Sequence, residues 1–589
     1  MNICQSCKSE FRITPNEQEV LIKLSLPAPT FCPVCSLIRR VSYRNERILY
    51  KRKCDAPGHE EDVISIFSPD KPDRIYCQTA WWGDSWDGLM YARDYDFTRP
   101  FFSQIRDLWK DVPDMALSNF NSVNSEYCSI TEGNKNCYLV IGGDFNENCL
   151  YSAFVFNSKD VMDCYWLKKC ERCYEVCESI SCTNISYSMF CEGCFDSAFL
   201  FNCKNCHHCF GCANLKNASY QIWNKQYTKD EYDKKIKEIQ IENFDNKVFQ
   251  KMQYDEFIKN FPRKYARILN SFGCTGDNIN HAKNVTNSFD VFDGAEDCAN
   301  LWLTYSQAKN CANSDHIGKN SELSYESTTV YPGSRVVSCR MILDCHDIAY
   351  SHNCHNCSYL FGCIGLRGKQ YCIFNKQYTK EEYENMLTKI INHMNEMPYI
   401  DKRGIVYKYG EFFPTELSPF AYNETVASEL APLSKEEILG HGYTYQSPQN
   451  KTYSATLDSG LIPKTISEVS DNITQEVITC DHAGACAHTC STAFRITPEE
   501  LEFYRRTNTP IPHLCWNCRH YERITYRNPL TLSRKVCDCN GNSSKNDVYK
   551  NTTSHPHGVV ACNTEFETSF PKDSDTIVYC ESCYQQEVA

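Results

Sequence analysis

The chain begins with paired cysteines whose spacing is typical of metal sites. Cys4-x2-Cys7 is followed, after 24 intervening residues, by Cys32-x2-Cys35. Two such pairs place four thiolates where they can complete a tetrahedral Zn²⁺ site, and an all-cysteine site leaves no open position for catalysis. The sequence therefore predicts a structural zinc site, in which the metal stabilises a segment too small to form its own core.

The same module recurs at the C-terminus. An offset of 483 in residue number overlays Cys32 and Cys35 on Cys515 and Cys518 without a gap, and both modules carry the segment Phe-Arg-Ile-Thr-Pro. Upstream, we match the first pair with Cys486 and Cys490. The predicted second zinc site is therefore Cys486, Cys490, Cys515 and Cys518. In each module the Thr-Pro step and a following acid predict a capped helix between the two cysteine pairs.

Further cysteines follow each module and predict additional metal sites. At the C-terminus, Cys537-x-Cys539 and Cys580-x2-Cys583 can form one, and further candidate ligands lie between them at His555, His557 and Cys562. The N-terminal counterpart keeps only Cys54 and Cys77, with His59 as a third candidate, because Pro57 and Ala80 stand where second cysteines would complete the pairs. We expect two to four Zn²⁺ per chain, and the sequence does not decide whether the N-terminal counterpart holds metal.

Both modules carry arginines interleaved with tyrosines after the second cysteine pair. The candidates for contact with a partner are Arg39, Arg40, Arg44, Arg47, Arg519, Arg523 and Arg527. Positive charge beside aromatic rings suits contact with phosphates and stacking on bases. The alternative is that these arginines dock on a protein partner or on the acidic body of the chain itself. The net charge of −13 argues against a surface devoted as a whole to nucleic acid.

Between the modules, cysteines recur at a fixed interval. Five of them follow one another at a spacing of 21, at Cys128, Cys149, Cys170, Cys191 and Cys212. A fixed period of this size is typical of a solenoid. The pattern predicts a mainly β protein built on a parallel β-helix, with about 21 residues and three short strands per coil. Within such an interior, cysteine serves as a small hydrophobe, and metal binding or thiol redox chemistry, strongest at Cys203–Cys212, is the alternative.

The solenoid is itself duplicated. Residues 202–232 and 353–383 share 18 identities in 31 positions, and the period is blurred before residue 334, which predicts insertions there. The expected plan is a zinc module (1–80), a helical connector (81–120), β-helix half 1 (121–222), a helical insertion (223–270), β-helix half 2 (271–374), flanking helices (375–440), a linker (441–480) and a second zinc module (481–589). The connector should contain a helix with Phe101, Phe102, Ile105, Leu108 and Trp109 on one face.

Several of these motifs resemble one family. The segments Phe31-Cys32-Pro33-x-Cys35 and Tyr43-Arg44-Asn45-Glu46-Arg47, the NKQYTKEEY run at 375–383 and Gly410-Glu411-Phe412-Phe413-Pro414 are similar to a group of large cysteine-rich zinc-ribbon proteins of candidate-phylum bacteria. The resemblance implies a cytoplasmic zinc-binding protein and no particular activity. The chain opens without a signal-peptide pattern and has no apolar run long enough for a membrane span, so we expect a cytoplasmic protein with reduced thiols and no membrane contact.

Three functions fit the sequence. The first is a non-enzymatic scaffold whose β-helix rod presents the two basic zinc modules to a protein, a nucleic acid or a ribonucleoprotein. The second is a carbohydrate-active enzyme on the β-helix, with acids such as Asp290, Asp293, Glu296 and Asp297 as candidates for acid–base work. The third is a metal-buffering or thiol redox protein that uses the regularly spaced cysteines stacked in columns inside the predicted solenoid. No phosphate-binding loop, nucleophile elbow or dinucleotide fingerprint is present in the sequence, and no catalytic residue is predicted.

Overall fold

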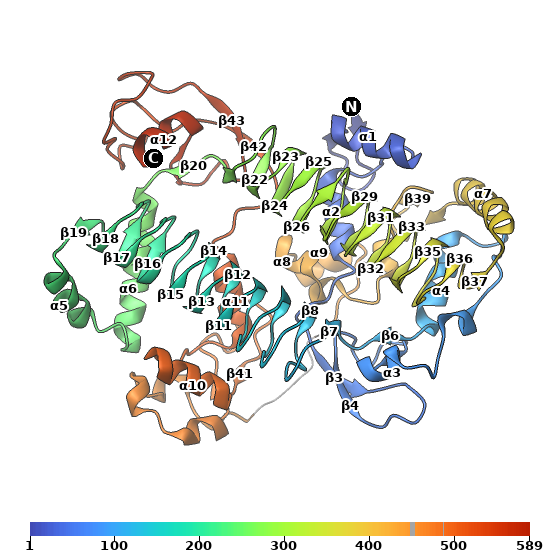
Figure 1. Ribbon diagram of the computed structural model, residues 1–589, viewed down its shortest axis with the longest axis horizontal. Helices are drawn as coiled ribbons and strands as arrows, with labels where there is room; N and C mark the ends of the chain where they lie inside the picture. The colour runs from blue at the N-terminus through green and yellow to red at the C-terminus, as the bar shows by residue number, and fades with distance from the viewer. Residues whose placement is uncertain (448–453, 487, 589) are drawn as a thin grey trace.

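The computed structural model describes residues 1–447, 454–486 and 488–588 of the chain. It is mainly β, as expected, and two long stacks of parallel strands dominate it (Figure 1). The first stack extends from β7 (Asn119–Phe120) to β19 (Lys225–Gln226), with sheets of six and seven strands. The second stack extends from β21 (Ile268–Leu269) to β37 (Lys376–Gln377), with sheets of eight and nine strands.

In the middle of the first stack and along most of the second, the chain alternates between the two sheets. In the first stack, β11 (Lys159–Met162) pairs with β13 (Glu171–Tyr174), and β12 (Tyr165–Lys168) pairs with β14 (Cys177–Ile180). Paired residues such as Lys159 and Glu171 are 12 positions apart. One strand from each sheet, with its connections, thus forms one rung of the stack. The expected coil, with three strands and a repeat of 21, is therefore wrong.

A backbone period of three residues explains both the rung of 12 residues and the cysteine spacing of 21. Along the first stack every third residue adopts the left-handed conformation, as at Lys169, Arg172, Glu175 and Glu178, where φ is 55°, 50°, 50° and 46°. The residue that follows such a position points inward, as Cys170 and Cys173 do. A rung contains four of these triplets, and the cysteine spacing of 21 contains seven. Cysteines at this spacing therefore all face the interior, although they belong to different columns.

The interior of the first stack suits cysteine. The Cys164 thiol donates to the backbone carbonyls of Met162, at 3.2 Å, and of Cys173, at 3.6 Å. Cys191 and Cys203 make the equivalent contacts with the carbonyls two residues before and nine residues after them. The side chain fills a narrow space, and its weak donor faces inward-pointing carbonyl groups. These contacts support the interpretation of the column cysteines as small interior residues.

The second stack contains the predicted insertions. Paired residues there are 13 apart at Lys283–Glu296 and Asp315–Thr328, whereas Glu322 pairs with Ser334 at a separation of 12. The extra residue in these rungs moves the inward-facing position by one each time. The sequence period is blurred before residue 334 for this reason.

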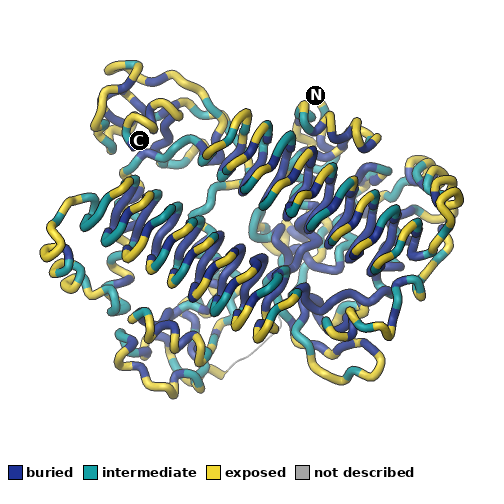
Figure 2. Tube along the Cα trace, in the orientation of Figure 1, coloured by how far each residue is buried: buried dark blue, intermediate teal, exposed yellow. Residues whose placement is uncertain are grey.

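The two stacks lie side by side (Figures 1 and 2), and the strand labels of Figure 1 show that they run in opposite directions. Lys319 forms an ion pair with Glu132 at 2.7 Å, whereas further along the first stack Trp166 packs on Phe292, with ring centroids 3.9 Å apart. Residue numbers therefore rise along one stack while they fall along the other. This arrangement relates the two halves of the duplicated chain by an approximate two-fold axis.

Helices cover the far end of each stack. The predicted capping boxes are present on α5 (Lys229–Ile239) and α7 (Lys380–Glu396). The first helix packs on β18 (Ser219–Ile222) and the second on β36 (Gln370–Ile373). They protect strand edges that would otherwise expose unpaired backbone groups.

The connecting segments agree in part with the expected plan. Helix α4 (Phe101–Asp111) buries all five of the predicted apolar side chains. Part of the predicted linker, by contrast, is packed, because Ile462, Ile466, Val469 and Ile473 are buried in the largest apolar cluster. Residues 448–453 of that linker lie outside the described residues. Among the residues that the structure describes, no helix is long and apolar enough to cross a membrane.

The three-residue backbone period can be tested at an exposed left-handed position. Ser181 has φ of 54° and faces solvent. We expect Ser181→Val to lower the free energy of unfolding by about 1–2 kcal/mol, because a β-branched side chain is strained in this region. The control Ser181→Asn should leave stability nearly unchanged, since asparagine tolerates this conformation. Equal denaturant midpoints for the two variants would contradict the assigned period.

Candidate metal centres

The four cysteines predicted at the N-terminus come together. Cys4 and Cys7 follow the short hairpin strand β1 (Asn2–Ile3), which pairs with β2 (Glu10–Phe11), and Cys32 is the N-cap of α2 (Pro33–Val41). The four sulfur atoms lie within 4.8 Å of one another, and those of Cys7 and Cys32 are 3.7 Å apart. A tetrahedral zinc–thiolate site requires sulfur–sulfur distances of about 3.8 Å. The group can therefore hold one metal ion.

The thiols of this group compete for protons. A hydrogen bond from the Cys35 thiol lowers the pKa of Cys32 to about 5, and the same bond raises the pKa of Cys35. The position of Cys32 at a helix N-terminus also favours a thiolate. Four thiolates in contact repel one another, and a divalent cation is the charge that lets all four ionise together.

The first C-terminal group differs from the predicted one by a single residue. Its closed set is Cys480, Cys490, Cys515 and Cys518, and the predicted ligand Cys486 instead lies with His482, His488 and Cys518. Strand pairing shows why: β40 (Ile478–Thr479) pairs with β41 (Ala493–Phe494) as β1 pairs with β2, so Cys480 is the true counterpart of Cys4. Sequence spacing missed Cys480 because seven extra residues separate it from Cys490.

The second C-terminal group also differs from the prediction. The set that comes together is Cys537, Cys562, Cys580 and Cys583, and the predicted ligand Cys539 lies with His555, His557 and Cys583. Three of the four predicted cysteines thus share one set, and Cys562 takes the place of Cys539. The further candidates between the cysteine pairs belong to these sets: Cys562 to the first, and His555 and His557 to the second.

The N-terminal counterpart of this group contains three candidate ligands, Cys54, His59 and Cys77. The Cys77 backbone N–H donates to the Cys54 sulfur at 3.1 Å, just as that of Cys580 donates to Cys537 at 3.2 Å. The Nδ1 of His59 lies 3.5 Å from the Cys77 sulfur. All three candidate ligands are therefore adjacent, and Glu61 contacts the same histidine nitrogen at 2.9 Å.

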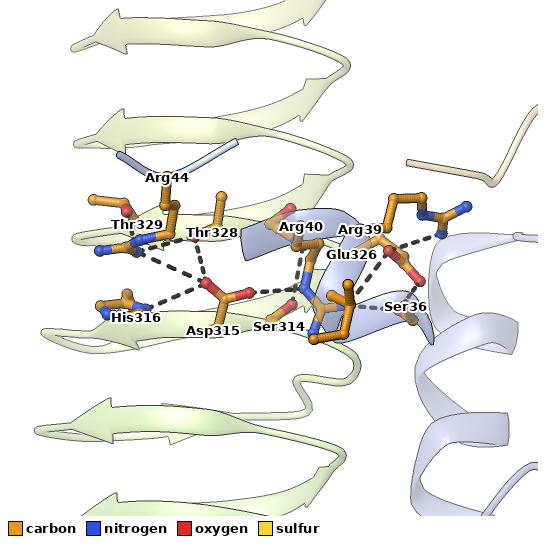
Figure 3. A network of polar contacts seen from close by, with 12 residues as sticks. Ser36, Arg39, Arg40, Arg44, Ser314, Asp315, His316, Glu326, Thr328 and Thr329 are labelled. Atoms are coloured by element: carbon orange, nitrogen blue, oxygen red, sulfur yellow. Dashed lines mark hydrogen bonds and ion pairs between the residues drawn. The ribbon is translucent and has the colours of Figure 1, made fainter. Parts of the chain in front are cut away.

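The arginines of the N-terminal module are buried against the second stack (Figure 3). Arg40 contacts Asp315 at 2.8 Å, and Arg39 contacts Glu326 at 3.1 Å and Glu411 at 2.7 Å. Arg39, Arg40 and Asp315 are each at most 2% exposed. Burial by itself raises the pKa of Asp315, but the hydrogen bond from His316 and the charge of Arg40 outweigh it and lower that pKa. Asp315 is therefore a buried anion with cationic partners.

The neighbouring Arg44 completes this network. Its guanidinium donates to the hydroxyl groups of Thr328, at 3.1 Å, and Thr329, at 2.8 Å, and it forms an ion pair with Glu46. Helix α1 (Pro15–Leu24) extends the contact: Glu17, expected to complete a capping box, instead accepts hydrogen bonds from Asn300 and Asn313 of the second stack. Tertiary contact thus takes the side chain away from its local role.

The C-terminal module makes the equivalent contact with the first stack. Arg519 and Arg523 both contact Asp163, at 3.0 Å and 3.1 Å, and the aspartate has no exposed surface. Arg527 forms ion pairs with Glu178 of the first stack and Asp290 of the second. Each module therefore docks on a stack of the opposite half of the chain. The duplicated halves are interlocked.

These contacts correct the prediction of a partner-binding surface. Six of the seven arginines face acids of the two stacks or of their own module, and the seventh, Arg47, contacts Glu429 at 3.2 Å and lies over the Trp516 ring of the other module. None has a guanidinium free for phosphates. Of the alternatives derived from the sequence, docking on the acidic body of the chain itself is the one that the contacts support.

The acids proposed for catalysis are occupied as well. Asp290 contacts Arg527, Asp293 contacts Lys168, and Asp297 accepts a hydrogen bond from Asn284. Glu296 lies between Lys283 and Lys309, at 2.8 Å and 3.3 Å. None of these four acids lines the cleft described next.

A cleft opens between the two stacks. It is small, with a cavity volume of about 50 Å³, and its walls include Phe154, Phe156, Tyr305 and Tyr331. Asp144 lies in this cleft, where burial raises its pKa to about 6. Glu132 also lines the cleft and is paired with Lys319. Sequence reasoning missed these residues because they come from strands of both halves.

No protein-family model matches this chain, and no curated protein is significantly similar to it.

The buried contact between the module and the second stack predicts a stability effect. Asp315→Asn leaves Arg40 buried beside a neutral amide, so we expect the free energy of unfolding to fall by about 3–5 kcal/mol. Glu296→Gln, which removes partly exposed ion pairs with Lys283 and Lys309, is the control and should change stability little. Urea unfolding of both variants measures the difference. Equal losses would show that the buried network does not hold the module.

The same aspartate predicts a dependence on pH. Its pKa is lowered in the folded protein, so its contribution to stability is complete above the unfolded value near 3.9 and is lost as the pH falls below it. The difference in stability between the wild type and Asp315→Asn should therefore shrink between about pH 4 and pH 2. A constant difference over this range would contradict an ionised Asp315.

Proposed function

We propose that this protein is a non-enzymatic, zinc-stabilised scaffold of the cytoplasm. In this proposal the two strand stacks are closed β-solenoids, and the terminal cysteine modules are zinc-ribbon-like clamps that hold them together. The observation that carries the proposal is the reciprocal docking of buried arginines on Asp163 and Asp315. Because the arginines of each module pair with acids of the same chain, we infer that the modules stabilise the arrangement of the chain itself.

The chemistry of the cysteine groups supports the same role. In each group four protein donors surround one position, which leaves none for a substrate or water. Thiolate and imidazole donors favour Zn²⁺ over Mg²⁺ or Ca²⁺. Each module also begins its docking helix at a cysteine, since Cys32 is the N-cap of α2 and Cys515 that of α11 (Trp516–Ile524). The metal would therefore fix the helix that carries the docking arginines.

The surface left for a partner is the outside of the stacks. With a net charge of −13 and the module arginines enclosed, this surface favours a protein partner over the phosphates of a nucleic acid. The exposed turns of the rungs repeat at a constant spacing, which is the kind of extended surface that solenoid proteins use for binding.

The scaffold proposal predicts that the modules keep the two stacks in one rigid body. A compact chain of this length has a radius of gyration of about 25 Å. We expect Asp163→Asn combined with Asp315→Asn, or removal of metal with a chelator, to increase this radius in small-angle X-ray scattering and to expose the segments between the stacks to protease. The control Asp293→Asn removes only a partly exposed ion pair between the stacks. An unchanged radius after both treatments would contradict the proposal.

A second candidate function rests on the cleft between the stacks. Apolar and aromatic walls with a few polar groups are typical of sites that bind small ligands. Two carboxyl groups in different environments can divide acid and base roles in glycoside chemistry. Because the cavity is small, we propose a single sugar residue of a glycan as the ligand that enters it, with Asp144 as the acid.

The test is a titration of the protein with a panel of neutral oligosaccharides, followed by intrinsic fluorescence. Tyr305→Ala should reduce affinity at least tenfold, because it removes an aromatic wall, whereas Asp144→Asn should abolish any turnover and retain binding. The exposed Tyr127→Ala serves as the control. Absence of binding by the wild type across the panel would remove this candidate and leave the scaffold.

A further inference from the structure

We propose that each cysteine group of the C-terminal module holds two Zn²⁺ ions joined by one thiolate, which is Cys518 in the first centre and Cys583 in the second. The inference rests on the metal-binding part of the proposed function and goes beyond it, because a structural module of this size needs only one ion per group. Three features of the module support it: the shared donors, the environments of the histidines and the segments that carry the extra ligands.

The donor sets overlap at one sulfur in each group. Cys518 belongs both to the set with Cys480, Cys490 and Cys515 and to the set with His482, Cys486 and His488. Its sulfur lies 3.5 Å from that of Cys515, 3.9 Å from that of Cys480 and 3.7 Å from that of Cys486. These values match the sulfur–sulfur distance of about 3.8 Å in a tetrahedral site. One thiolate therefore stands at ligand distance from two metal positions.

Each histidine of the first centre has an unsatisfied ring nitrogen. The Nδ1 atoms of His482 and His488 are buried and make no hydrogen bond to any described residue. A buried, unpaired ring nitrogen is costly. Both belong to the same donor set as Cys486 and Cys518. Coordination of a second metal ion would satisfy both nitrogens.

The histidines of the second centre are oriented as metal ligands usually are. The Nε2 of His555 contacts Glu587 at 2.9 Å, and its Nδ1 lies 3.5 Å from the Cys539 sulfur. The Nδ1 of His557 donates to the Val560 carbonyl at 2.7 Å, and its Nε2 lies 3.2 Å from the Cys583 sulfur. In both rings one nitrogen is held by an oxygen, which fixes the tautomer and directs the other nitrogen toward the thiolates.

The extra donors lie in segments that lengthen the C-terminal module. Nine residues separate Cys480 from Cys490, where two separate Cys4 from Cys7, and the longer segment carries His482 and Cys486 together with His488. Likewise, the segment between Cys537 and Cys580 is nearly twice as long as that between Cys54 and Cys77. That segment supplies His555, His557 and Cys562. Each insertion thus adds the donors that a second ion requires.

The charge of such a centre is moderate. The first centre combines five thiolates and two neutral imidazoles with two divalent ions, which gives a net charge of −1. Each ion has four protein ligands and no open position, so the centre is structural. A pair of ions cross-links more of the chain than a single ion does, which suits a module that docks on a stack and also contacts the other module.

The test is native mass spectrometry of the full chain purified with Zn²⁺. We expect at least five ions: one at the Cys4 group and two at each C-terminal group. His482→Ala combined with His488→Ala should remove one ion, and His555→Ala combined with His557→Ala should remove another, while circular dichroism shows the fold retained. His207→Ala combined with His208→Ala, on the first stack, is the matched control and should leave the count unchanged.

A second readout detects the bridge itself. After replacement of Zn²⁺ by Co²⁺, magnetic coupling through a shared thiolate should leave fewer paramagnetic spins than cobalt ions, and each double histidine variant should restore one isolated spin. A count that is the same in the wild type and in both histidine variants would overturn the inference, as would uncoupled spins in the wild type. A chain without any zinc would instead contradict the proposed function, so the two failures are distinguishable.

Discussion

Two carboxylates enclosed in the strand stacks, Asp163 and Asp315, fix the arrangement of the whole molecule. Neither has exposed surface, and each accepts contacts from arginines of a terminal module. A charge in such a position is tolerable only when an opposite charge is held against it. If a module left its stack, the enclosed aspartate and the module arginines would lose their opposite charges, which would lower the stability of the folded chain. This requirement links the ends of the chain to its middle.

The reciprocal docking gives the duplication a structural meaning. Each half of the sequence contains one module and one stack, yet each module docks on the stack of the other half. Asp163 lies just before β12 of the first stack, and Asp315 is the first residue of β28 (Asp315–Gly318) of the second. Arg40 and Arg523, which are equivalent in the two modules, contact them. Neither half can bury its arginines alone, so the two halves are expected to be stable only together.

Metal binding and arginine docking act on the same helices. Cys32 and Cys515 are the N-caps of α2 and α11, and the docking arginines lie further along these helices or just beyond their ends. An ion at the start of the helix fixes its direction, and the ion pairs fix its position on the stack. The cysteine columns of the stacks belong to a different environment, where thiols contact backbone carbonyls. The abundance of cysteine in this chain thus has two separate physical causes.

Local features of this protein could be predicted from its residues alone. Cysteine pairs at short spacing predicted the groups at both ends, the Thr-Pro steps predicted α1 and α10 (Pro498–Thr507), and the duplication predicted two β regions. These features depend on neighbouring residues, so periodicity and spacing suffice to find them. The three-residue period is also present in the regular cysteine spacing. The rung of 12 residues and the cysteine spacing of 21 are both multiples of three, so the spacing alone does not give the length of a rung.

Which donors meet, and which charges are enclosed, depends on how distant segments pack in three dimensions. Cys480 takes the place predicted for Cys486 because the pairing of β40 with β41, and not the distance in sequence, positions the first cysteine of the group. Arg39, Arg40 and Arg44 form a basic stretch in sequence, yet they are buried because acids from a distant part of the chain face them. Spacing alone cannot reveal contacts between distant segments, since they depend on how the two stacks pack against each other.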